Sequence, residues 1–363
     1  MMNNPKTPLE WGKSACDSLM NRFKPNKLPP ENSWHYHQGV FLYSMIRLWE
    51  KVGDERYYQY AKAYVDLLID ERGNLLFRRD ELDSMQAGLL LFTLDRSSDD
   101  PRYKIAADKL MNVFGTLNQT SEGGYWHKDK YPNQMWLDGL YMGGVFAVEY
   151  AHAYDKPIWL ERVLYQEKLM RSHMYDKTTG LLYHAWDESR RMPWSDPQTG
   201  CSPEFWGRSV GWYGMAVVDI LDRLPESMEG REALIASLQG LIKALAQFQD
   251  QDSGLWYQVV DKGQHSDNWL ETSGSSLFVY TIAKAIAKGY VGNEYLNIAR
   301  RGYEGLINQL YYDENEQLVM PAICIGTSAG DYENYITRPV SENDLHGVGA
   351  LVLACVEMEK ILY

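Results

Sequence analysis

The sequence predicts an all-α protein whose helices form an (α/α)6 toroid of six inner and six outer helices. Two observations predict this fold: amphipathic helices alternate with wholly apolar ones, and a short Gly-aromatic segment recurs along the chain. The chain has 363 residues, 45% of them hydrophobic, and can bury a large core. Because no linker rich in Pro, Gly or Ser interrupts it, we expect residues 1–363 to form a single domain.

One set of predicted helices is amphipathic and should form the outer ring. In one of them Tyr57, Tyr60, Ala61, Tyr64 and Leu68 fall on a single stripe, as expected for a helix that keeps one face in water. The set covers residues 9–23, 57–70, 103–117, 160–174, 233–248 and 295–311. The Gly-aromatic segments that follow lie at residues 73–77, 123–127, 180–184, 254–258 and, less regularly, 318–320.

The other set of helices carries no charge, which suits helices that are covered on every face. Two concentric rings satisfy the strict alternation of the two sets. A straight helical solenoid is the structural alternative, but neither terminus shows an obviously polar capping repeat, which favours closure. The apolar set covers residues 39–46, 88–94, 139–148, 211–218, 274–282 and 347–356.

Composition excludes several classes of protein. The net charge of -13, from 49 acidic and 36 basic residues without long runs, argues against nucleic-acid binding. Cys16, Cys201, Cys324 and Cys355 lie far apart, so we expect reduced thiols rather than a zinc site or disulfides. The first 20 residues lack the apolar core of a secretory signal, and no stretch has the roughly 20 apolar residues of a membrane span. We expect a cytoplasmic protein with no membrane contact and no obligate protein partner.

The loops that lead into the apolar helices are rich in Trp, His and carboxylate side chains, and in a toroid they open on one rim. Trp34, Trp136, Trp206 and Trp269 lie in these loops, and Trp212 follows one of them at the start of an apolar helix. Aromatic faces stack on sugar rings while polar neighbours bond to hydroxyls, so the rim indicates a carbohydrate-binding cleft. The alternative is that some tryptophans only close the barrel ends. The loops cover residues 34–38, 78–83, 135–138, 204–208, 268–271 and 343–346.

Asp138 is the sharpest candidate for catalysis, because it lies where a loop meets an uncharged helix. Burial among Met135, Trp136 and Tyr141 should raise its pKa, so that it stays protonated and serves as a general acid near neutral pH. The alternative is a helix N-cap. At a helix N-terminus the carboxylate would also be stabilised as the anion, which opposes a raised pKa.

Asp83 occupies the matching place before another apolar helix, so the fold should aim two carboxyl groups at one cavity. Two acids in one cleft suggest acid/base work on a glycosidic substrate. Alternatively, Asp80, Glu81 and Asp83 form a solvated helix start with Asp83 as its cap.

Histidines and one arginine complete the candidate rim. None of the histidines forms a His-x-x-x-His or Glu-x-x-His pair, so we expect no metal site, and hydrogen bonds to hydroxyls or a carboxylate instead. Arg208 begins an uncharged helix and needs an anionic partner, either an acidic substrate or a protein acid such as Glu204. Trp212, one turn later, would offer a stacking face beside that charge. The rim histidines are His35, His37, His127, His184 and His346.

Seven runs of sequence, in the same order over most of the chain, closely resemble unsaturated rhamnogalacturonyl hydrolases of glycoside hydrolase family 105. The resemblance extends from about residue 34 to the C-terminus, and the family's (α/α)6 barrel agrees with the ring count. The runs are WHYHQGVF (34–41), LLFRRDELD (75–83), TSEGGYWHKD (120–129), QMWLDGLYMGG (134–144), YHAWD (183–187), GCSPEFWGRSVGWY (200–213) and NDLHG (343–347).

The resemblance implies hydrolysis of pectin fragments that carry a 4,5-unsaturated galacturonic acid linked to rhamnose at the non-reducing end. In that chemistry an acid protonates C4 of the vinyl ether, charge develops at C5 and the ring oxygen, water adds at C5, and the hemiketal opens and sheds the sugar. Asp138 resembles the family's proton donor and Asp83 its second acid. Residues that resemble its binding residues are His35, Tyr36, His127, His184, Arg208, Trp212 and, in the loop 326–330, Thr327.

We therefore predict an exo-acting hydrolase of unsaturated rhamnogalacturonan oligosaccharides that needs no metal or organic cofactor. The enzyme alternative is an unsaturated glucuronyl hydrolase acting on glycosaminoglycan-derived disaccharides, which would share the barrel and the acid. The alternative from a different class is a non-catalytic sugar-binding toroid.

Overall fold

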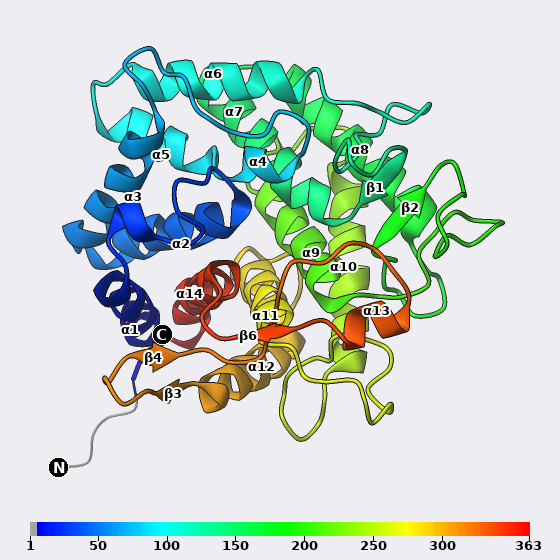
Figure 1. Ribbon diagram of the computed structural model, residues 1–363. Helices are drawn as coiled ribbons and strands as arrows, with labels where there is room; N and C mark the ends of the chain where they lie inside the picture. The colour runs from blue at the N-terminus through cyan, green and yellow to red at the C-terminus, as the bar shows by residue number, and fades with distance from the viewer. Residues whose placement is uncertain (1–5) are drawn as a thin grey trace.

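Outer and inner helices alternate along the chain in the computed structural model, which describes residues 6–363 (Figure 1). The outer helices are α1 (Pro8–Arg22), α3 (Glu55–Leu68), α6 (Arg102–Phe114), α8 (Ile158–Met174), α10 (Arg231–Phe248) and α12 (Leu296–Gln309). The inner positions hold α2 (Tyr36–Val52), α4 (Asp83–Gln86) with α5 (Leu89–Ser97), η2 (Leu140–Val145) with α7 (Phe146–Tyr154), α9 (Gly207–Leu221), α11 (Thr272–Ala287) and α14 (Leu345–Leu362).

The inner helices form a closed ring. Helix α14 packs against both α11 and α2, α11 packs against α9, α9 against η2, and η2 against α4, which returns to α2. The first helix, α1, therefore lies beside the last helix, α14 (Figure 1). This closure confirms the predicted (α/α)6 toroid and excludes the straight solenoid, in which the ends would not meet.

Burial explains the two kinds of helix. Helix α9 is buried at every position, whereas the outer helix α10 buries only one side. Each outer helix packs against an inner one, as α3 does on α2 and α10 on α9, and keeps its polar side in water. The charge-free runs within the inner helices thus follow from their position, because an unpaired charge there would lose its hydration.

The Gly-aromatic repeat is a tight turn after an outer helix. Gly73, Gly123, Gly180 and Gly254 all have φ between 67° and 85°, a left-handed backbone that glycine adopts without a steric penalty. Antiparallel backbone bridges such as Tyr175 to Leu182 close three of these turns. The fifth repeat is less regular because Glu316, at φ 58°, takes the left-handed position instead of a glycine.

Two inner helices are irregular close to the predicted acids. Helices α4 and α5 are separated at Ala87 and Gly88, where α2 approaches closely: a Cβ on Gly39 would lie 2.7 Å from the Cα of Ala87. The segment η2 is a π-helix that begins two residues after Asp138, and such wide turns are frequent at functional sites. Both irregularities shape the end of the ring at which Asp83 and Asp138 lie.

Short elements in the loops complete the described structure. The 3-10 turns are η1 (Pro25–Lys27) and η3 (Asn293–Tyr295), and α13 (Tyr332–Ile336) is a short helix. The strands are β1 (Gln134–Trp136) with β2 (Ala185–Asp187), β3 (Tyr311–Tyr312) with β4 (Leu318–Val319), and β5 (Ile323–Cys324) with β6 (Val340–Ser341), each pair antiparallel. Within the described residues, no helix combines the length and apolarity needed to cross a membrane. All four cysteines are buried and free.

Candidate active site

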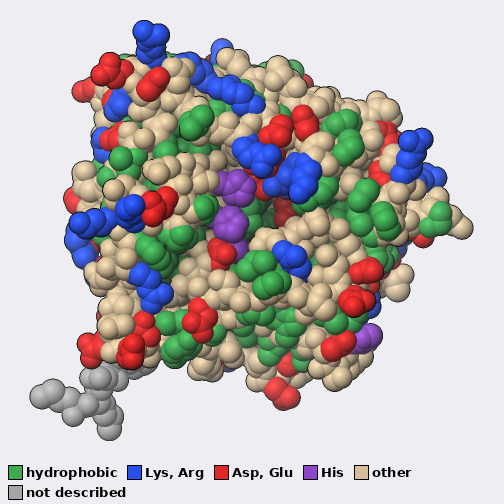
Figure 2. Space-filling model, viewed as in Figure 1, with side chains coloured by type: hydrophobic (Ala, Val, Ile, Leu, Met, Phe, Trp, Pro, Cys, Tyr) green, Lys and Arg blue, Asp and Glu red, His purple; other side chains and the backbone are tan. Residues whose placement is uncertain are grey.

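A pocket of about 410 Å³ opens at the end of the ring where the loops enter the inner helices. This volume is typical of small-ligand sites. Figure 2 shows the face as a hollow bordered by histidine, acidic and basic side chains. Most of the residues that the sequence singled out line it: His35, Tyr36, Asp83, His127, Asp138, Arg208 and Thr327.

A two-stranded ladder brings Asp138 and His184 together. Strands β1 and β2 pair so that Trp136 lies opposite Ala185, and the backbone N–H of Leu137 donates to the carbonyl of His184 at 3.0 Å. Asp138 follows β1 and His184 precedes β2, so their side chains meet. Nε2 of His184 lies 3.3 Å from Oδ2 of Asp138, and neither atom has another partner among the residues described.

The pKa of Asp138 differs from the sequence-based prediction. Burial raises it, as we expected, but the close contact with His184 and electrostatic interactions with His184 and His127 outweigh burial and hold the pKa below its usual value. The prediction of a raised pKa was therefore wrong, because it counted burial and omitted a histidine 46 positions away. The N-cap alternative fails too, since Gly139 caps η2 and no side-chain capping bond is formed there.

Asp83 lies in a denser cluster of charges. Backbone contacts align two loops here: the N–H of Leu82 donates to the carbonyl of His127, and Glu81 pairs with Lys128 across a β-bridge. As a result the Lys128 ammonium donates to Asp83 and lies 3.2 Å from Glu81. Nε2 of His127 lies 3.1 Å from Asp83 Oδ1, and Nε2 of His35 lies 3.5 Å from Asp83 Oδ2.

These neighbours keep Asp83 ionised. Burial raises its pKa, but the charges of His127 and Lys128 and the hydrogen bonds from His127 and His35 hold the pKa well below the usual range. The carboxylate is 4% exposed and faces other side chains, so it is not the cap of a solvated helix start. Although His35, Glu81 and Asp83 have the spacing of metal ligands, the Lys128 ammonium already lies against both carboxylates.

Arg208 is a buried cation without an acidic partner. It is 1% exposed, and its guanidinium donates to two backbone carbonyls, those of Cys324 and, at 2.8 Å, Ile325. Glu204, the protein acid that the sequence offered as an alternative partner, pairs with Lys262 instead. In the described part of the chain no carboxylate forms an ion pair with Arg208, which lines the pocket together with Asp138.

Two predicted residues do not reach the pocket wall. Trp212 is 1% exposed and stacks on Tyr141 with ring centroids 4.8 Å apart, so the prediction that it offers a stacking face to a sugar was wrong. Its place one turn beyond Arg208 points it into the ring, while the indoles of Trp136 and Trp206 line the pocket. His184 is fully buried behind Asp138, where it contacts the acid rather than the cavity.

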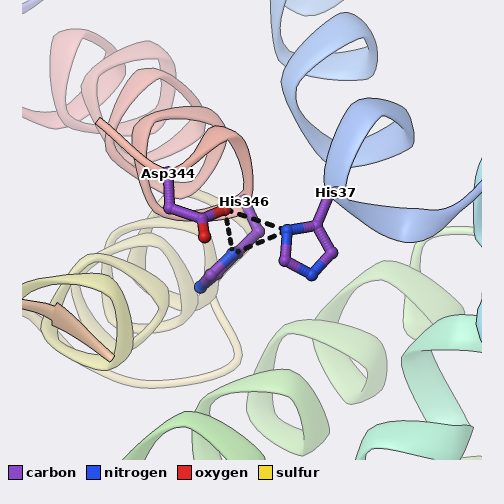
Figure 3. Close-up of side chains that lie close together, drawn as sticks. All are labelled: His37, Asp344 and His346. Carbon is purple, nitrogen blue, oxygen red and sulfur yellow. Dashed lines mark hydrogen bonds and ion pairs between the residues drawn. The ribbon is translucent and has the colours of Figure 1, made fainter. Parts of the chain in front are cut away.

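A third carboxylate lies between two histidines beside the pocket. Oδ1 of Asp344 is 2.9 Å from Nδ1 of His37 and 2.7 Å from Nδ1 of His346, and the three side chains converge from α2 and the start of α14 (Figure 3). Burial lowers the pKa of His346 to about 4. These atoms have the spacing of metal ligands, but both imidazoles can donate to Asp344, and the nearby Arg208 charge opposes a bound cation.

Several pocket residues were not singled out from the sequence. Lys128 was within a quoted run and directly follows His127, so its place beside a carboxylate could have been suspected. Arg338 and Tyr131 also line the pocket, and Tyr335 contacts His184 from α13. No motif or periodicity marks these three, since they are brought in by loops far apart in sequence.

Known proteins share this architecture and much of this sequence. The family model described as Glycosyl Hydrolase Family 88 matches residues 11–362. Protein Atu3128 of Agrobacterium fabrum is 34% identical over 60% of this chain and 97% of its own length. Unsaturated rhamnogalacturonyl hydrolase YesR of Bacillus subtilis is 24% identical over 90% of each chain. The solved structure of a family 105 glycoside hydrolase from Clostridium acetobutylicum is 33% identical, with a TM-score of 0.91 over 96% of this chain and 99% of the other.

Proposed function

This chain belongs to glycosyl hydrolase family 88, and from that premise we propose that it removes a 4,5-unsaturated galacturonic acid from the non-reducing end of rhamnogalacturonan oligosaccharides. The activity in the name of the B. subtilis relative supports this substrate. So does the family resemblance of the runs that carry Asp83, Asp138 and Arg208.

The buried Arg208 carries the proposal. A guanidinium removed from water and bonded only to neutral carbonyls leaves a strong preference for an anion unsatisfied. A uronate carboxylate in the pocket would meet that charge, and a neutral sugar would not. The indoles of Trp136 and Trp206 offer apolar surface to the sugar ring in the same cavity.

Asp138 is the proton donor of the proposed reaction. Its proton goes to C4 of the unsaturated sugar while positive charge develops at C5 and the ring oxygen. Water adds to C5 and returns a proton to the Asp138 carboxylate. The resulting hemiketal opens to a C5 ketone, and the hemiacetal at C1 releases rhamnose as a free hydroxyl compound. A bound uronate brings negative charge beside Asp138, which favours the protonated form that the first step needs.

Asp83 has a different part in this proposal. Because three donors keep it ionised, it accepts hydrogen bonds from substrate hydroxyls or from the attacking water rather than giving a proton. Lys128 and His127 hold the carboxylate in place for that purpose. Together the two acids divide the work of proton transfer and of positioning.

The substrate is tested with two disaccharides, unsaturated galacturonyl-rhamnose and an unsaturated glucuronyl disaccharide from a glycosaminoglycan, by loss of absorbance of the conjugated double bond. We expect the first to be the better substrate. Faster turnover of the second would make the protein an unsaturated glucuronyl hydrolase, and binding of both without turnover would make it a sugar-binding toroid. In heavy-oxygen water the label should enter the product of the unsaturated residue, and label in rhamnose would contradict the vinyl-ether route.

Arg208 is tested with a neutral substrate as the matched control. Arg208→Met should raise KM for the acidic disaccharide by about 10²-fold, because a charge-assisted pair of bonds is lost. The methyl ester of the same disaccharide should show almost no difference between the variant and the wild type. An equal loss with both substrates would mean that Arg208 only supports the fold.

A further inference from the structure

We propose that Tyr335 is a positioning residue for the acid: its hydroxyl fixes the tautomer of His184 that turns an N–H toward Asp138. The proposal rests on the proposed function in one respect, namely that Asp138 is the proton donor. It concerns a residue from α13, which is 151 positions from His184 in sequence and lies outside every run that resembles the family.

Three contacts in series define the arrangement. The backbone N–H of Gly330 donates to the Tyr335 hydroxyl oxygen at 3.1 Å. That oxygen lies 2.7 Å from Nδ1 of His184, and Nε2 of His184 lies 3.3 Å from Oδ2 of Asp138. Tyr335 and His184 are both 0% exposed, so bulk water does not replace any of these contacts.

The hydrogen-bonding needs of the buried Tyr335 hydroxyl and His184 imidazole favour one placement of the protons. The Tyr335 hydroxyl has a single proton, and among the residues described its only neighbour able to accept that proton is Nδ1 of His184. When Nδ1 accepts, the neutral imidazole carries its hydrogen on Nε2, which faces the Asp138 carboxylate. The Nε2–H then faces Oδ2 of Asp138 at 3.3 Å, and neither atom has another partner in residues 6–363.

The opposite tautomer would leave two buried groups unsatisfied. With hydrogen on Nδ1, the Tyr335 hydroxyl proton would have no acceptor, and the lone pair of Nε2 would face the lone pairs of Asp138. Leaving a buried polar group without its bond costs roughly 1–3 kcal/mol, so the first tautomer should dominate. Burial lowers the pKa of His184, which keeps the imidazole neutral and makes its tautomer matter.

Neighbouring side chains hold the His184 imidazole in place, but they do not determine which of its nitrogens carries the hydrogen. The rings of Trp206 and Trp136 pack on His184 at centroid distances of 4.7 Å and 5.2 Å. The charged and titratable groups that act on the series are Asp83, His127, Arg208, Glu204 and Asp331. None of these five forms a hydrogen bond to either imidazole nitrogen in residues 6–363.

Removal of the hydroxyl should change the pH profile in a defined direction. In Tyr335→Phe, Nδ1 loses its donor and the second tautomer becomes populated, so His184 stabilises the Asp138 anion less and the pKa of Asp138 rises. Since the donor must be protonated, the basic limb of the kcat/KM profile should move up by about one pH unit. Tyr332→Phe is the matched control, because it removes a hydroxyl of the same helix whose one hydrogen bond within the described residues goes to Asp267.

The result decides the proposal. A basic limb that moves up in Tyr335→Phe and stays in Tyr332→Phe supports it. An unchanged limb, or one that moves down, overturns it, because a merely structural hydroxyl would lower the rate without displacing the limb in this direction.

Nitrogen NMR of histidine-labelled wild-type protein reads the tautomer directly, with His184→Gln to assign the signal. We expect a proton on Nε2, and a proton on Nδ1 would refute the proposal even if Tyr335→Phe fails to fold. This measurement needs no substrate. A protein that lacks the proposed activity but has the Nε2–H tautomer would therefore contradict the proposed function and leave the positioning role of Tyr335 intact.

Discussion

Asp83 and Asp138 face one pocket from neighbouring loops, and their surroundings differ in the number of donors. Asp83 is met by the Lys128 ammonium and by the imidazoles of His127 and His35. Among residues 6–363, the side chain that pairs with Asp138 is the imidazole of His184 alone. Both carboxyl groups are buried to a similar degree, so the donors rather than burial separate them.

The difference between their surroundings indicates which of the two acids takes up a proton more readily. The pKa of Asp83 lies well below its usual range, while that of Asp138 is lowered with fewer opposing charges, so a proton added to the pocket goes to Asp138 more readily. Two carboxyl groups whose environments differ in this way typically take different roles. In the proposed function the same residue type thus supplies both a proton donor and a fixed anion to one pocket.

Loss of the proton donor should reduce the activity most. Asp138→Asn should lower kcat/KM by about 10³-fold, because the amide has no proton to give to C4. The rate is followed by loss of absorbance of the double bond. Thermal unfolding is the control: the variant should stay folded with a Tm equal to or slightly below that of the wild type, because the amide can still contact His184 but the ionic part of that interaction is lost. Turnover near the wild-type rate would break the assignment of Asp138.

A smaller loss is expected at the fixed anion. Asp83→Asn should lower kcat/KM by about 10²-fold, because the amide still accepts hydrogen bonds but no longer balances the Lys128 and His127 charges. Separate values of kcat and KM show whether positioning or binding suffers. A loss as large as that of Asp138→Asn, with the basic limb of the profile removed, would mean that the two acids share the proton.

Asp344, the third carboxylate beside the pocket, lies between His37 and His346. Its neighbour His346 makes the stability of the folded chain depend on pH. The pKa of His346 is about 4 in the folded chain against 6.5 unfolded, so the unfolded chain binds a proton first as pH falls. The stabilisation of the fold that depends on a neutral His346 is complete above about pH 6.5 and is lost as the pH falls toward 4. It amounts to about 2 kcal/mol between pH 7 and 5.

Urea unfolding at pH 7 and pH 5 measures this loss of stability. In His346→Gln the difference between the two pH values should be smaller than in the wild type by about that amount. Equal differences in both proteins would show that His346 titrates alike in the folded and unfolded chains.

The smallest effect sharpens the role of the donors around Asp83. In Lys128→Met one charge is lost, the pKa of Asp83 rises, and Asp83 becomes protonated at a higher pH. The acid limb of kcat/KM should therefore move up by about one pH unit. Lys130→Met is the matched control, because the Lys130 ammonium lies over Tyr131 rather than against Asp83. An acid limb that moves equally in both variants would point to the general charge of the pocket.

Much of the architecture could be predicted from the sequence, because the spacing of apolar residues over a few helical turns indicates both the helix and the face that it buries. The charge-free runs of α9 and α14 predict helices without a solvent-exposed face, and the glycines of the repeat predict left-handed turns. The placement of Asp83, Asp138 and Arg208 at one rim followed from their positions before inner helices. The single-domain organisation and the catalytic roles of these residues stay predictions.

The closed double ring of helices, and the end at which its polar loops gather, could be predicted from local sequence patterns. The surroundings of each side chain at that end became known from the fold: His184 opposes the effect of burial on Asp138, Trp212 turns inward, and Tyr335 contacts His184. In residues 6–363 no carboxylate forms an ion pair with Arg208. These facts escaped the sequence because the residues concerned lie far apart along the chain. Periodicity is a property of neighbours a few residues apart, whereas a pKa or an unsatisfied charge depends on contacts between distant segments, such as His184 and Tyr335, which are 151 positions apart, and His37 and Asp344, which are 307 apart.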